Sequence, residues 1–416
     1  MRVSTTQMFR NGISTMQQNQ QALSNTQLQL STGKRILKPS DDPSGSVQSL
    51  QFRSAIQQTE QYQRNGGMAE QRLSLSETTL SAVGEGLHRV RELAIQGNNA
   101  TQTDDTRKFI AGEIRQILDE LMQLANTRDA NGEFIYAGVT SLTQPFSTGS
   151  GGEVIYNGDD GQRQVQLSPV RQVAVGNSGQ EVFMDIPTGN GVFTVHDSAG
   201  NTGTGVVDAG SVLDASAWDP DDYTLSFDFN SEGELVYQVT RLDTNGDVVV
   251  VVPESGDADW DEAPQFVAGQ AIQFNGIELR VSGTPAVGDS FAVVPSQNQD
   301  MFSTFRQLAE ALEAPVESDA DRATLNNAVN RALQDLDNAL GNVLDIRAGV
   351  GARLKAVESQ RAINEDVLLQ LKTTLSEVED LDYAEAISRF NMQQTTLQAA
   401  QQTYVQVQRL SLFNFL

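Results

Sequence analysis

The sequence predicts a multidomain α+β protein in which two helical ends flank an inserted, mainly β domain. Three observations predict it: sevenfold apolar spacing near both termini, helical patterns beside these segments, and a change of composition between them. The chain of 416 residues is long enough for two or three domains with cores of their own. We therefore expect a long-helix coiled coil or bundle built by both ends of the chain, carrying the β domain as an insert.

An apolar side chain recurs every seven residues at each end of the chain. Such spacing keeps one stripe facing a partner helix along a supercoil. A helix cannot bury its own stripe, so we expect the ends to pack against each other or against neighbouring copies. The alternative is that the stripes form the core of an ordinary helical bundle or of a long-stalk dimer. The predicted assembly interface comprises these rows and the apolar C-terminal tail: Phe9, Met16, Leu23, Leu30, Tyr383, Phe390, Leu397, Tyr404, Val407, Phe413, Phe415 and Leu416.

Helical patterns fill roughly the first 127 residues. Asp42 can cap a helix that begins at the following proline, where a missing N–H costs nothing. That helix should reach about Gly97, because apolar residues from Leu73 to Ala94 keep the sevenfold spacing. Apolar residues at helical spacing from Ile110 to Leu124 mark a third helix, whose face the preceding helix can bury. The run Phe134-Ile135-Tyr136 is expected to be a strand.

The composition shifts toward Gly, Asp, Val and Thr from about residue 145 to residue 298. Apolar and polar side chains alternate between Tyr223 and Phe229, as in a half-buried strand. Four further runs are similar: 235–240, 247–252, 277–281 and 290–294. Asn-Gly pairs at 157–158, 245–246 and 275–276 suit type I′ hairpin turns. These patterns predict short strands but not their order.

Helical patterns return at Met301. They predict one helix to Glu313, a second from about Asp319 to Glu377, and a last helix that follows Asp382 and ends near Leu412. The predicted terminal coiled coil consists of an N-terminal helix, residues 1–40, and a C-terminal helix, residues 379–416. Between them we expect a helical rod in two pieces, residues 41–144 and 299–378, which flank a β-rich outer domain, residues 145–298.

The negative charge of the chain is concentrated in its middle part. Residues 151–300 carry 4 Lys and Arg against 24 Asp and Glu, whereas residues 1–150 carry 14 of each. Binding to nucleic acid or to an anionic membrane needs clustered cations, so neither partner is expected. The sequence contains neither a run of eighteen apolar residues nor the apolar core of a cleavable secretory signal. The absence of cysteine excludes disulfides, thiol catalysis and cysteine metal sites.

Side chains for catalysis are scarce, and we expect neither an enzyme nor a cofactor. His88 and His196 are the only histidines of the sequence, and neither has a second histidine at ligand spacing. The run Ser31–Lys34 lacks the other positions of a phosphate-binding loop. Asp243–Asp247 and Asp257–Glu262 carry several carboxylates but do not fit an EF-hand. We therefore interpret these two runs as a hairpin turn and a solvated acidic loop, respectively, and we predict no metal site.

Several motifs resemble those of the flagellins and their hook-associated relatives. Leu30–Arg35, followed by Pro39–Pro43, resembles the N-terminal signature of that family, and Arg89–Gln96 is similar to its next block. Asp382–Ala386 and Leu397–Ala400 resemble the matching C-terminal block. Together these motifs lie in the helical parts, about residues 1–140 and 300–416. The β insert gives no motif from which a role could be carried over.

The details resemble the hook-associated branch of the family. Met1–Thr5, Phe134–Gly138, Asp289–Phe291 and Asn298–Phe302 are similar to that branch. The resemblance implies a subunit exported through the flagellar type III channel, which assembles as a short helical tier between hook and filament, outside the cell. It implies as partners copies of itself, a neighbouring hook-associated junction protein, flagellin, and a cytoplasmic export chaperone that binds the C-terminal helices.

Two other functions fit parts of the sequence. A filament flagellin would share the same helical ends, but it would grow long filaments instead of stopping after a limited tier. A secreted adhesin would bind a ligand through residues 145–298 and use the helices as a stalk with ordered ends.

Overall fold

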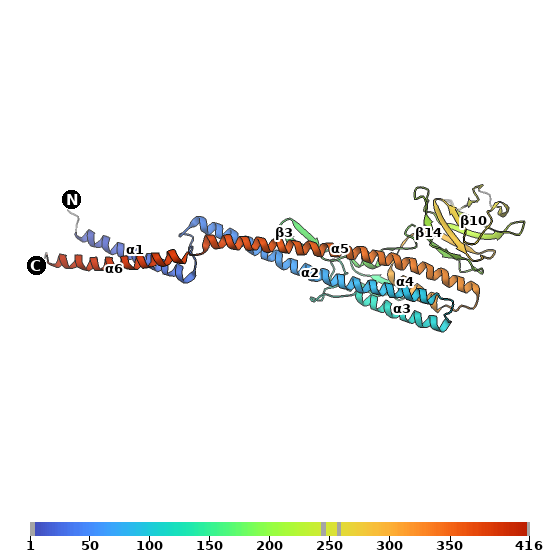
Figure 1. The fold of residues 1–416 in the computed structure, drawn as a ribbon, viewed down its shortest axis with the longest axis horizontal. Coiled ribbons are helices and arrows are strands. Elements are labelled where there is room, and N and C mark those ends of the chain that lie inside the picture. The colour runs from blue at the N-terminus through green and yellow to red at the C-terminus, as the bar shows by residue number, and fades with distance from the viewer. Residues whose placement is uncertain (1–4, 243–246, 256–258, 414–416) are drawn as a thin grey trace. The chain divides into compact units, whose positions relative to one another are not determined.

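The computed structural model describes residues 5–242, 247–255 and 259–413, and it combines long helices with a β region inserted between them (Figure 1). The helices are α1 (Thr5–Thr32), α2 (Pro43–Gly97), α3 (Asp104–Ala125), α4 (Met301–Glu313), α5 (Asp319–Glu379) and α6 (Tyr383–Phe413). All strands of the described part lie between α3 and α4 in the sequence. The expected α+β fold with helical ends and an inserted β domain is confirmed. None of these helices is long and apolar enough to cross a membrane.

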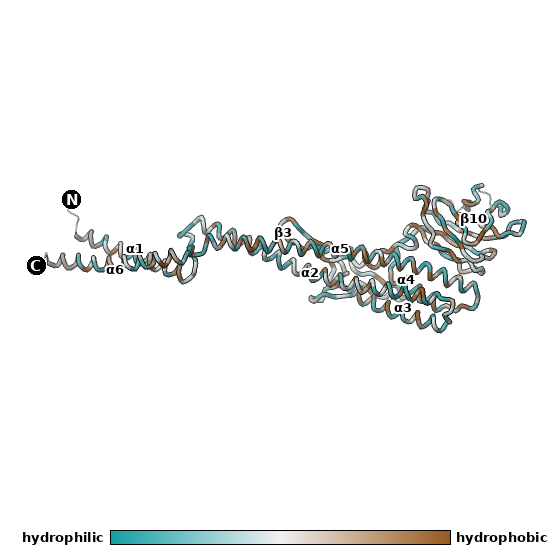
Figure 2. Tube along the Cα trace, in the orientation of Figure 1, coloured by the Kyte–Doolittle hydropathy of each residue, from teal (hydrophilic) through white to brown (hydrophobic). Residues whose placement is uncertain are grey.

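The chain divides into two compact units. The first comprises Met1–Gly66, Leu167–Arg171 and Ser359–Leu416, and the second comprises Gly67–Gln166 and Gln172–Glu358. Both ends of the chain therefore belong to the first unit, in which α1 and α6 lie side by side. Figure 2 shows that hydrophobic residues are scattered among hydrophilic ones along this pair.

The helical core of the second unit uses the predicted apolar rows. Leu73, Leu80, Leu87 and Ala94 of α2 are all buried. On α3, Ile110, Ile114 and Leu121 are buried as well, and α3 packs closely against α4. Two members of the predicted α3 face, Ile117 and Leu124, are only half-buried. The α2 and α3 rows are therefore mainly core, with one part of the α3 row left at the surface.

The prediction of a strand at Phe134-Ile135-Tyr136 is wrong. The three side chains are buried, but the segment makes only an isolated bridge, between Phe134 and Arg128. Its backbone groups bond to three different segments: the Phe134 N–H to the Ser141 carbonyl, the Ile135 N–H to Thr127, and the Tyr136 carbonyl to the Gly179 N–H. The apolar run therefore anchors a folded loop in the core instead of joining a sheet.

Two antiparallel sheets form most of the β region. One has the order β11-β10-β9-β14-β6, and the other has the order β12-β13-β7 with β8 also paired to β13. Two-stranded ribbons pair β1 with β2, β3 with β4, and β5 with β15. The bounds are β1 (Phe146–Thr148), β2 (Val154–Tyr156), β3 (Gln164–Ser168), β4 (Arg171–Ala174), β5 (Ile186–Pro187), β6 (Phe193–Asp197), β7 (Val206–Val207), β8 (Ser211–Val212), β9 (Tyr223–Phe229), β10 (Leu235–Leu242), β11 (Val248–Val252), β12 (Ala271–Phe274), β13 (Ile277–Ser282), β14 (Ser290–Pro295) and β15 (Asn298–Gln299).

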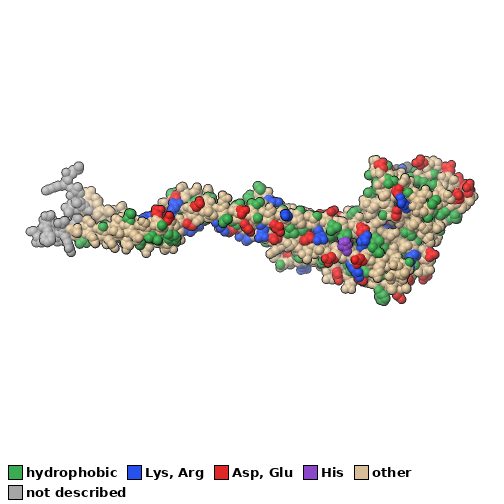
Figure 3. All heavy atoms as spheres, viewed as in Figure 1, with side chains coloured by type: hydrophobic (Ala, Val, Ile, Leu, Met, Phe, Trp, Pro, Cys, Tyr) green, Lys and Arg blue, Asp and Glu red, His purple; other side chains and the backbone are tan. Residues whose placement is uncertain are grey.

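Alternation of apolar and polar residues places one face of β9 in the core. Tyr223, Leu225 and Phe227 are buried in a cluster that both large sheets share, whereas Thr224 between them is exposed. The five strand runs predicted here are all observed, within two residues at each end. The surface of this region carries many Asp and Glu side chains and few Lys or Arg, as the charge count predicts (Figure 3).

The three Asn-Gly pairs have different outcomes. Asn275 and Gly276, at φ 42° and 77°, join β12 to β13 as the hairpin turn that was predicted. The pair 157–158 makes no hairpin, because β2 before it pairs with β1 and β3 after it pairs with β4. The pair 245–246 lies outside the described residues.

Candidate assembly interface

The α1–α6 pair brings the two predicted terminal rows together. The rings of Phe9 and Tyr404 meet edge to face, with centroids 5.9 Å apart. A Cβ on Gly12 would lie 3.5 Å from the Tyr404 ring, so the ring also covers this glycine. Beside this contact, Met16 and Leu397 line a groove of about 340 Å³ together with polar side chains of both helices. The rows that repeat every seven residues thus face each other across the pair.

The pair buries these rows only in part. Phe9, Met16, Leu23, Leu30, Phe390, Leu397 and Tyr404 are half-buried, and Tyr383 is 53% exposed. The side chains of Val407 and Phe413, and all of Phe415 and Leu416, lie outside the described residues. Further apolar side chains of α1 and α6 remain exposed: Ile13, Leu28, Ile387, Met392 and Val405. The terminal pair therefore retains apolar surface that a further helix could cover.

The signature Leu30–Arg35 forms the end of α1 and the turn after it. Gly33 has φ +70°, the left-handed conformation that glycine adopts readily after a helix. A Cβ there would also come within 2.8 Å of the Tyr383 hydroxyl. The Gly33 carbonyl accepts a hydrogen bond from the Leu381 N–H, and the Arg35 N–H donates to the Glu379 carbonyl. The motif that failed as a phosphate loop therefore ties α1 to the segment between α5 and α6.

Glu379 is the centre of an ion cluster at this turn. Its side chain is 5% exposed and receives a bidentate pair of hydrogen bonds from Arg53, at 2.8 Å from Nε and 2.7 Å from Nη2. The Lys34 ammonium and the Ser49 hydroxyl donate to the same carboxylate. The hydrogen bonds from Arg53, then those from Lys34 and Ser49, outweigh burial and lower the Glu379 pKa to about 2.

The sequence predicted neither Glu379 nor its partners Ser49 and Arg53. Lys34 was noted only as part of a motif. The contributing residues are separated by more than three hundred positions, and an acidic residue near a helix end has no spacing pattern that would name its partner. A buried carboxylate with two cationic partners appears only once α2 and α5 are placed side by side.

The motif Pro39–Pro43 builds a turn and a helix cap. The Asp41 carboxylate accepts hydrogen bonds from the Leu37 and Lys38 N–H groups, at 3.1 and 2.9 Å. Asp42 accepts from the Gly45 N–H at 2.9 Å, which is the main reason why its pKa is lowered. The predicted capping of α2 by Asp42 is confirmed. At the other chain end, Asp382 caps α6 in the same way through the Ala384 and Glu385 N–H groups.

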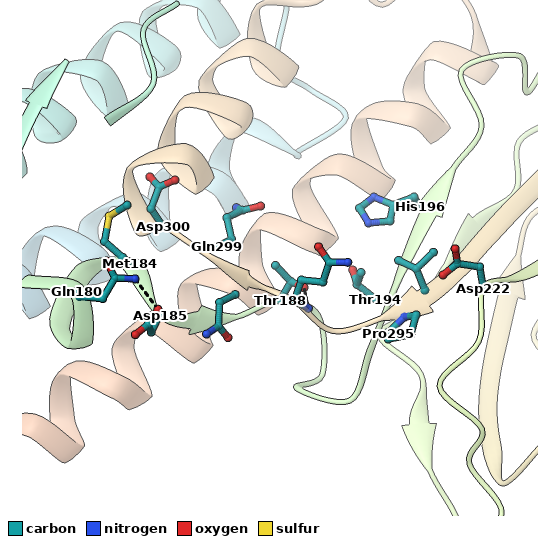
Figure 4. Close-up of a pocket in the computed structure, with 13 residues that line it drawn as sticks. Gln180, Met184, Asp185, Thr188, Thr194, His196, Asp222, Pro295, Gln299 and Asp300 are labelled. Atoms are coloured by element: carbon teal, nitrogen blue, oxygen red, sulfur yellow. Dashed lines mark hydrogen bonds between the residues drawn. The ribbon is translucent and has the colours of Figure 1, made fainter. Parts of the chain in front are cut away.

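A polar cavity of about 570 Å³ in the second unit is lined by residues of β6, β14 and β15 and by the segment 180–188 (Figure 4). Amide, hydroxyl and carboxylate side chains dominate it, among them Gln180, whose amide donates to Asp185 at 2.8 Å. Burial, and then the charge of Arg331, lower the pKa of His196 at its edge. Within the part of the chain that the structure describes, no three His, Asp or Glu side chains gather to hold a metal.

Comparison with known families matches both helical ends and the insert. Residues 3–141 match the bacterial flagellin N-terminal helical region, and residues 333–416 match the bacterial flagellin C-terminal helical region. Residues 196–295 match the D2-like domain of flagellar hook-associated protein 1, a segment in which the sequence had shown a resemblance only at Asp289–Phe291. Together with the paired chain ends, these matches define a flagellin-like structural protein of the bacterial flagellum.

Individual relatives show to which family of flagellar proteins the chain belongs. A flagellar hook-associated protein 3 from Legionella pneumophila is 38% identical, covering 79% of this chain and 98% of that one with a TM-score of 0.75. The Xanthomonas campestris protein FlgL is 32% identical, with coverages of 78% and 99% and a TM-score of 0.69. Flagellar hook-associated protein 3 of Escherichia coli strain K12 is 27% identical over 99% of both chains. The chain belongs to the flagellar hook-associated protein 3 family.

Flagellins are more distant relatives. The phase 1 flagellin of Salmonella naestved matches 29% of this chain and 25% of its own length, at 36% identity. The likeness is therefore confined to a part of the chain, whereas the hook-associated protein 3 of Escherichia coli matches 99% of it. Filament flagellin, the first alternative from the sequence, is not supported.

Proposed function

We propose that this chain forms the junction tier between the flagellar hook and the filament, through helical self-assembly driven by its paired ends. A solved relative described as a flagellar junction protein, from Legionella pneumophila, is 40% identical and covers 74% of this chain and 98% of its own, with a TM-score of 0.69. The observation that carries the mechanism is the half-buried α1–α6 pair, whose remaining apolar side chains need a further partner.

The physical basis is the difference between an isolated and an assembled helix pair. Long helices with polar flanks are marginal in water unless tertiary contacts bury their apolar face. In the tier, neighbouring copies cover Ile13, Leu28 and Met392, which are 41%, 49% and 68% exposed in the single chain. That burial offsets the entropy lost when the ends become ordered. Copies that meet through unlike surfaces continue as a helical array.

The partners follow from this position. A junction subunit contacts copies of itself, a hook-associated junction protein on one side and flagellin on the other. We also propose that the chain leaves the cell through the flagellar type III channel and that an export chaperone covers the C-terminal helices beforehand. The exposed apolar residues Tyr383, Ile387 and Met392 of α6 supply a surface for such a chaperone.

A secreted adhesin remains the alternative from another class. It would need a ligand site on the β domain and chain ends that are already fully buried. The half-exposed rows of α1 and α6 argue against ordered, self-sufficient ends.

Complementation tests the proposal directly. A strain that lacks its own junction subunit is expected to regain attached filaments when it expresses the wild-type chain. Leu397→Asp should abolish this, because a carboxylate placed in the half-buried α1–α6 row costs several kcal/mol to bury. The matched control is Leu142→Asp, at a side chain that is 81% exposed in a loop. Normal filaments with Leu397→Asp would refute the mechanism, and failure of the wild-type chain would refute the function.

A further inference from the structure

The second unit carries an apolar groove that its own side chains leave open. The groove, of about 520 Å³, lies between α2 and α3, and its apolar lining includes Val83, Gly86, Ile117, Leu121, Leu124 and Phe305. We call it the α2–α3 groove. Ile117 and Leu124 belong to the predicted core face of α3, yet they are half-buried because they form its wall. Apolar area of this kind gains free energy when a partner removes it from water.

Gly86 has no role in the packing of the single chain. A glycine inside a helix makes the helix less stable than an alanine would. Its φ is not positive, and a Cβ there would meet only the Ile117 side chain, at an ordinary contact distance of 3.5 Å. Alanine would therefore fit within the chain at this position. The effect of glycine is to keep the floor of the α2–α3 groove low.

An aromatic side chain projects from the neighbouring stretch of α3. Phe109 is 78% exposed, and it lies outside the buried face formed by Ile110 and Ile114. Phenylalanine is a large apolar group, so leaving its ring in water forfeits the free energy that its burial would release. Phe109 precedes Ile117 by eight residues on the same helix, which is about 12 Å along the axis. A rigid helix cannot bring the ring back to the groove of its own chain, so a Phe109 ring that fills this groove must come from another copy.

The charges around the two features are complementary. Lys108, beside Phe109, is exposed, and the rim of the groove carries the exposed side chains of Glu85, Arg89 and Glu120. The Arg89 guanidinium already pairs with Glu113 and Glu92, so Glu85 and Glu120 are the carboxylates of the rim that Lys108 can approach. A Phe109 ring seated in the groove of a second copy brings the Lys108 ammonium toward these acids. The contact joins unlike surfaces, so each copy both inserts a ring and receives one, which is the geometry of an open array.

We propose that Phe109 of one copy docks in the α2–α3 groove of a neighbouring copy in the assembled tier. This inference rests on the proposed junction function and names a contact in the rod that is separate from the terminal pair. Aromatic side chains in an apolar pocket are typical of residues that dominate an interface. Removing the ring should weaken incorporation by about tenfold or more.

Photo-cross-linking of the full chain tests the contact. A benzoyl-phenylalanine in place of Phe109 keeps an aromatic ring, and irradiation of assembled flagella should link it to peptides 82–89 or 117–124. Mixing isotope-labelled and unlabelled copies shows that the link joins two chains. The control carries the same group in place of Leu142, which is 81% exposed, and should not label the groove. Links from position 109 to other peptides, or to another protein, would overturn the proposal.

Substitutions provide a second readout in the same complementation strain. Phe109→Ala removes the ring, and Gly86→Leu fills the groove. Each substitution should reduce the number of attached filaments about tenfold and leave the circular dichroism spectrum unchanged. Leu142→Ala should have no effect. Normal filament numbers with both groove variants would overturn this contact but leave the junction function standing. If the wild-type chain does not restore filaments, the proposed function itself fails.

Discussion

The ion cluster at Glu379 predicts a large, pH-dependent stabilisation of the joint at which the end of α5 meets α2 and the turn after α1. Glu379→Gln keeps the shape of the side chain but leaves Arg53 and Lys34 without a charged partner. The pKa of Glu379 falls from 4.5 to about 2 because of its hydrogen bonds with Arg53, Lys34 and Ser49. At 1.36 kcal/mol per pKa unit, this corresponds to about 3 kcal/mol.

The direction of the pH dependence follows from the lowered pKa. The native state binds the proton less readily than the unfolded chain, so the stabilisation is complete above pH 4.5. It is lost progressively as the pH falls toward about 2. The Gln variant lacks it at every pH. Wild type and variant should therefore differ most near neutral pH and converge in acid.

Hydrogen exchange of individual amides measures this difference at the joint. The N–H groups of Arg35 and Leu381, bonded to Glu379 and Gly33, should exchange about 100-fold faster in the variant at pH 7. The control is Glu385→Gln, whose carboxylate is 71% exposed and pairs with Arg389 one turn away, a contact worth about 0.5 kcal/mol. Equal protection in the two variants at pH 7 would refute the reasoning.

Three further predictions concern the chain ends. Gly33→Ala should lower the free energy of unfolding of the joint by about 1–2 kcal/mol, because alanine is strained at φ +70°. Thermal unfolding measures the difference, and the control is Gly67→Ala, where an added Cβ would contact no other atom. Asp42→Ala should remove the N-terminal cap of α2, seen as faster exchange of the Gly45 amide but not of mid-helix amides. In the amide NMR spectrum of the monomer, about 35 residues at each end should add only sharp, poorly dispersed signals relative to a chain without them. Dispersed, protected signals would favour the stalk interpretation.

Local pattern was enough to predict most helices and five strands. Helix α4 begins and ends as predicted, because its apolar spacing coincides with the capping residue Asp300 and the break at Pro315. Strand β9 was predictable because its alternation places every second side chain in one core. The family signatures were visible for the same reason: turn and cap residues such as Asp41 and Asp42 act through neighbours in the sequence.

The failures came where burial and pairing involve distant residues. Phe134-Ile135-Tyr136 is as apolar as a strand, but its backbone bonds to Ser141, Thr127 and Gly179. No local property states which segment will supply those partners. The same applies to the sheet order, in which β14 pairs with both β6 and β9.

What the sequence determined by itself is the class: sevenfold rows at both ends, an acidic β insert, and signatures of the flagellin family. These are periodic or local properties, and short-range geometry is sufficient to express them. The tertiary structure alone decided that Glu379 meets Lys34, Ser49 and Arg53, and that Ile117 and Leu124 form the wall of a groove instead of a core. Both depend on which helices become neighbours, and long-range packing energy sets that choice.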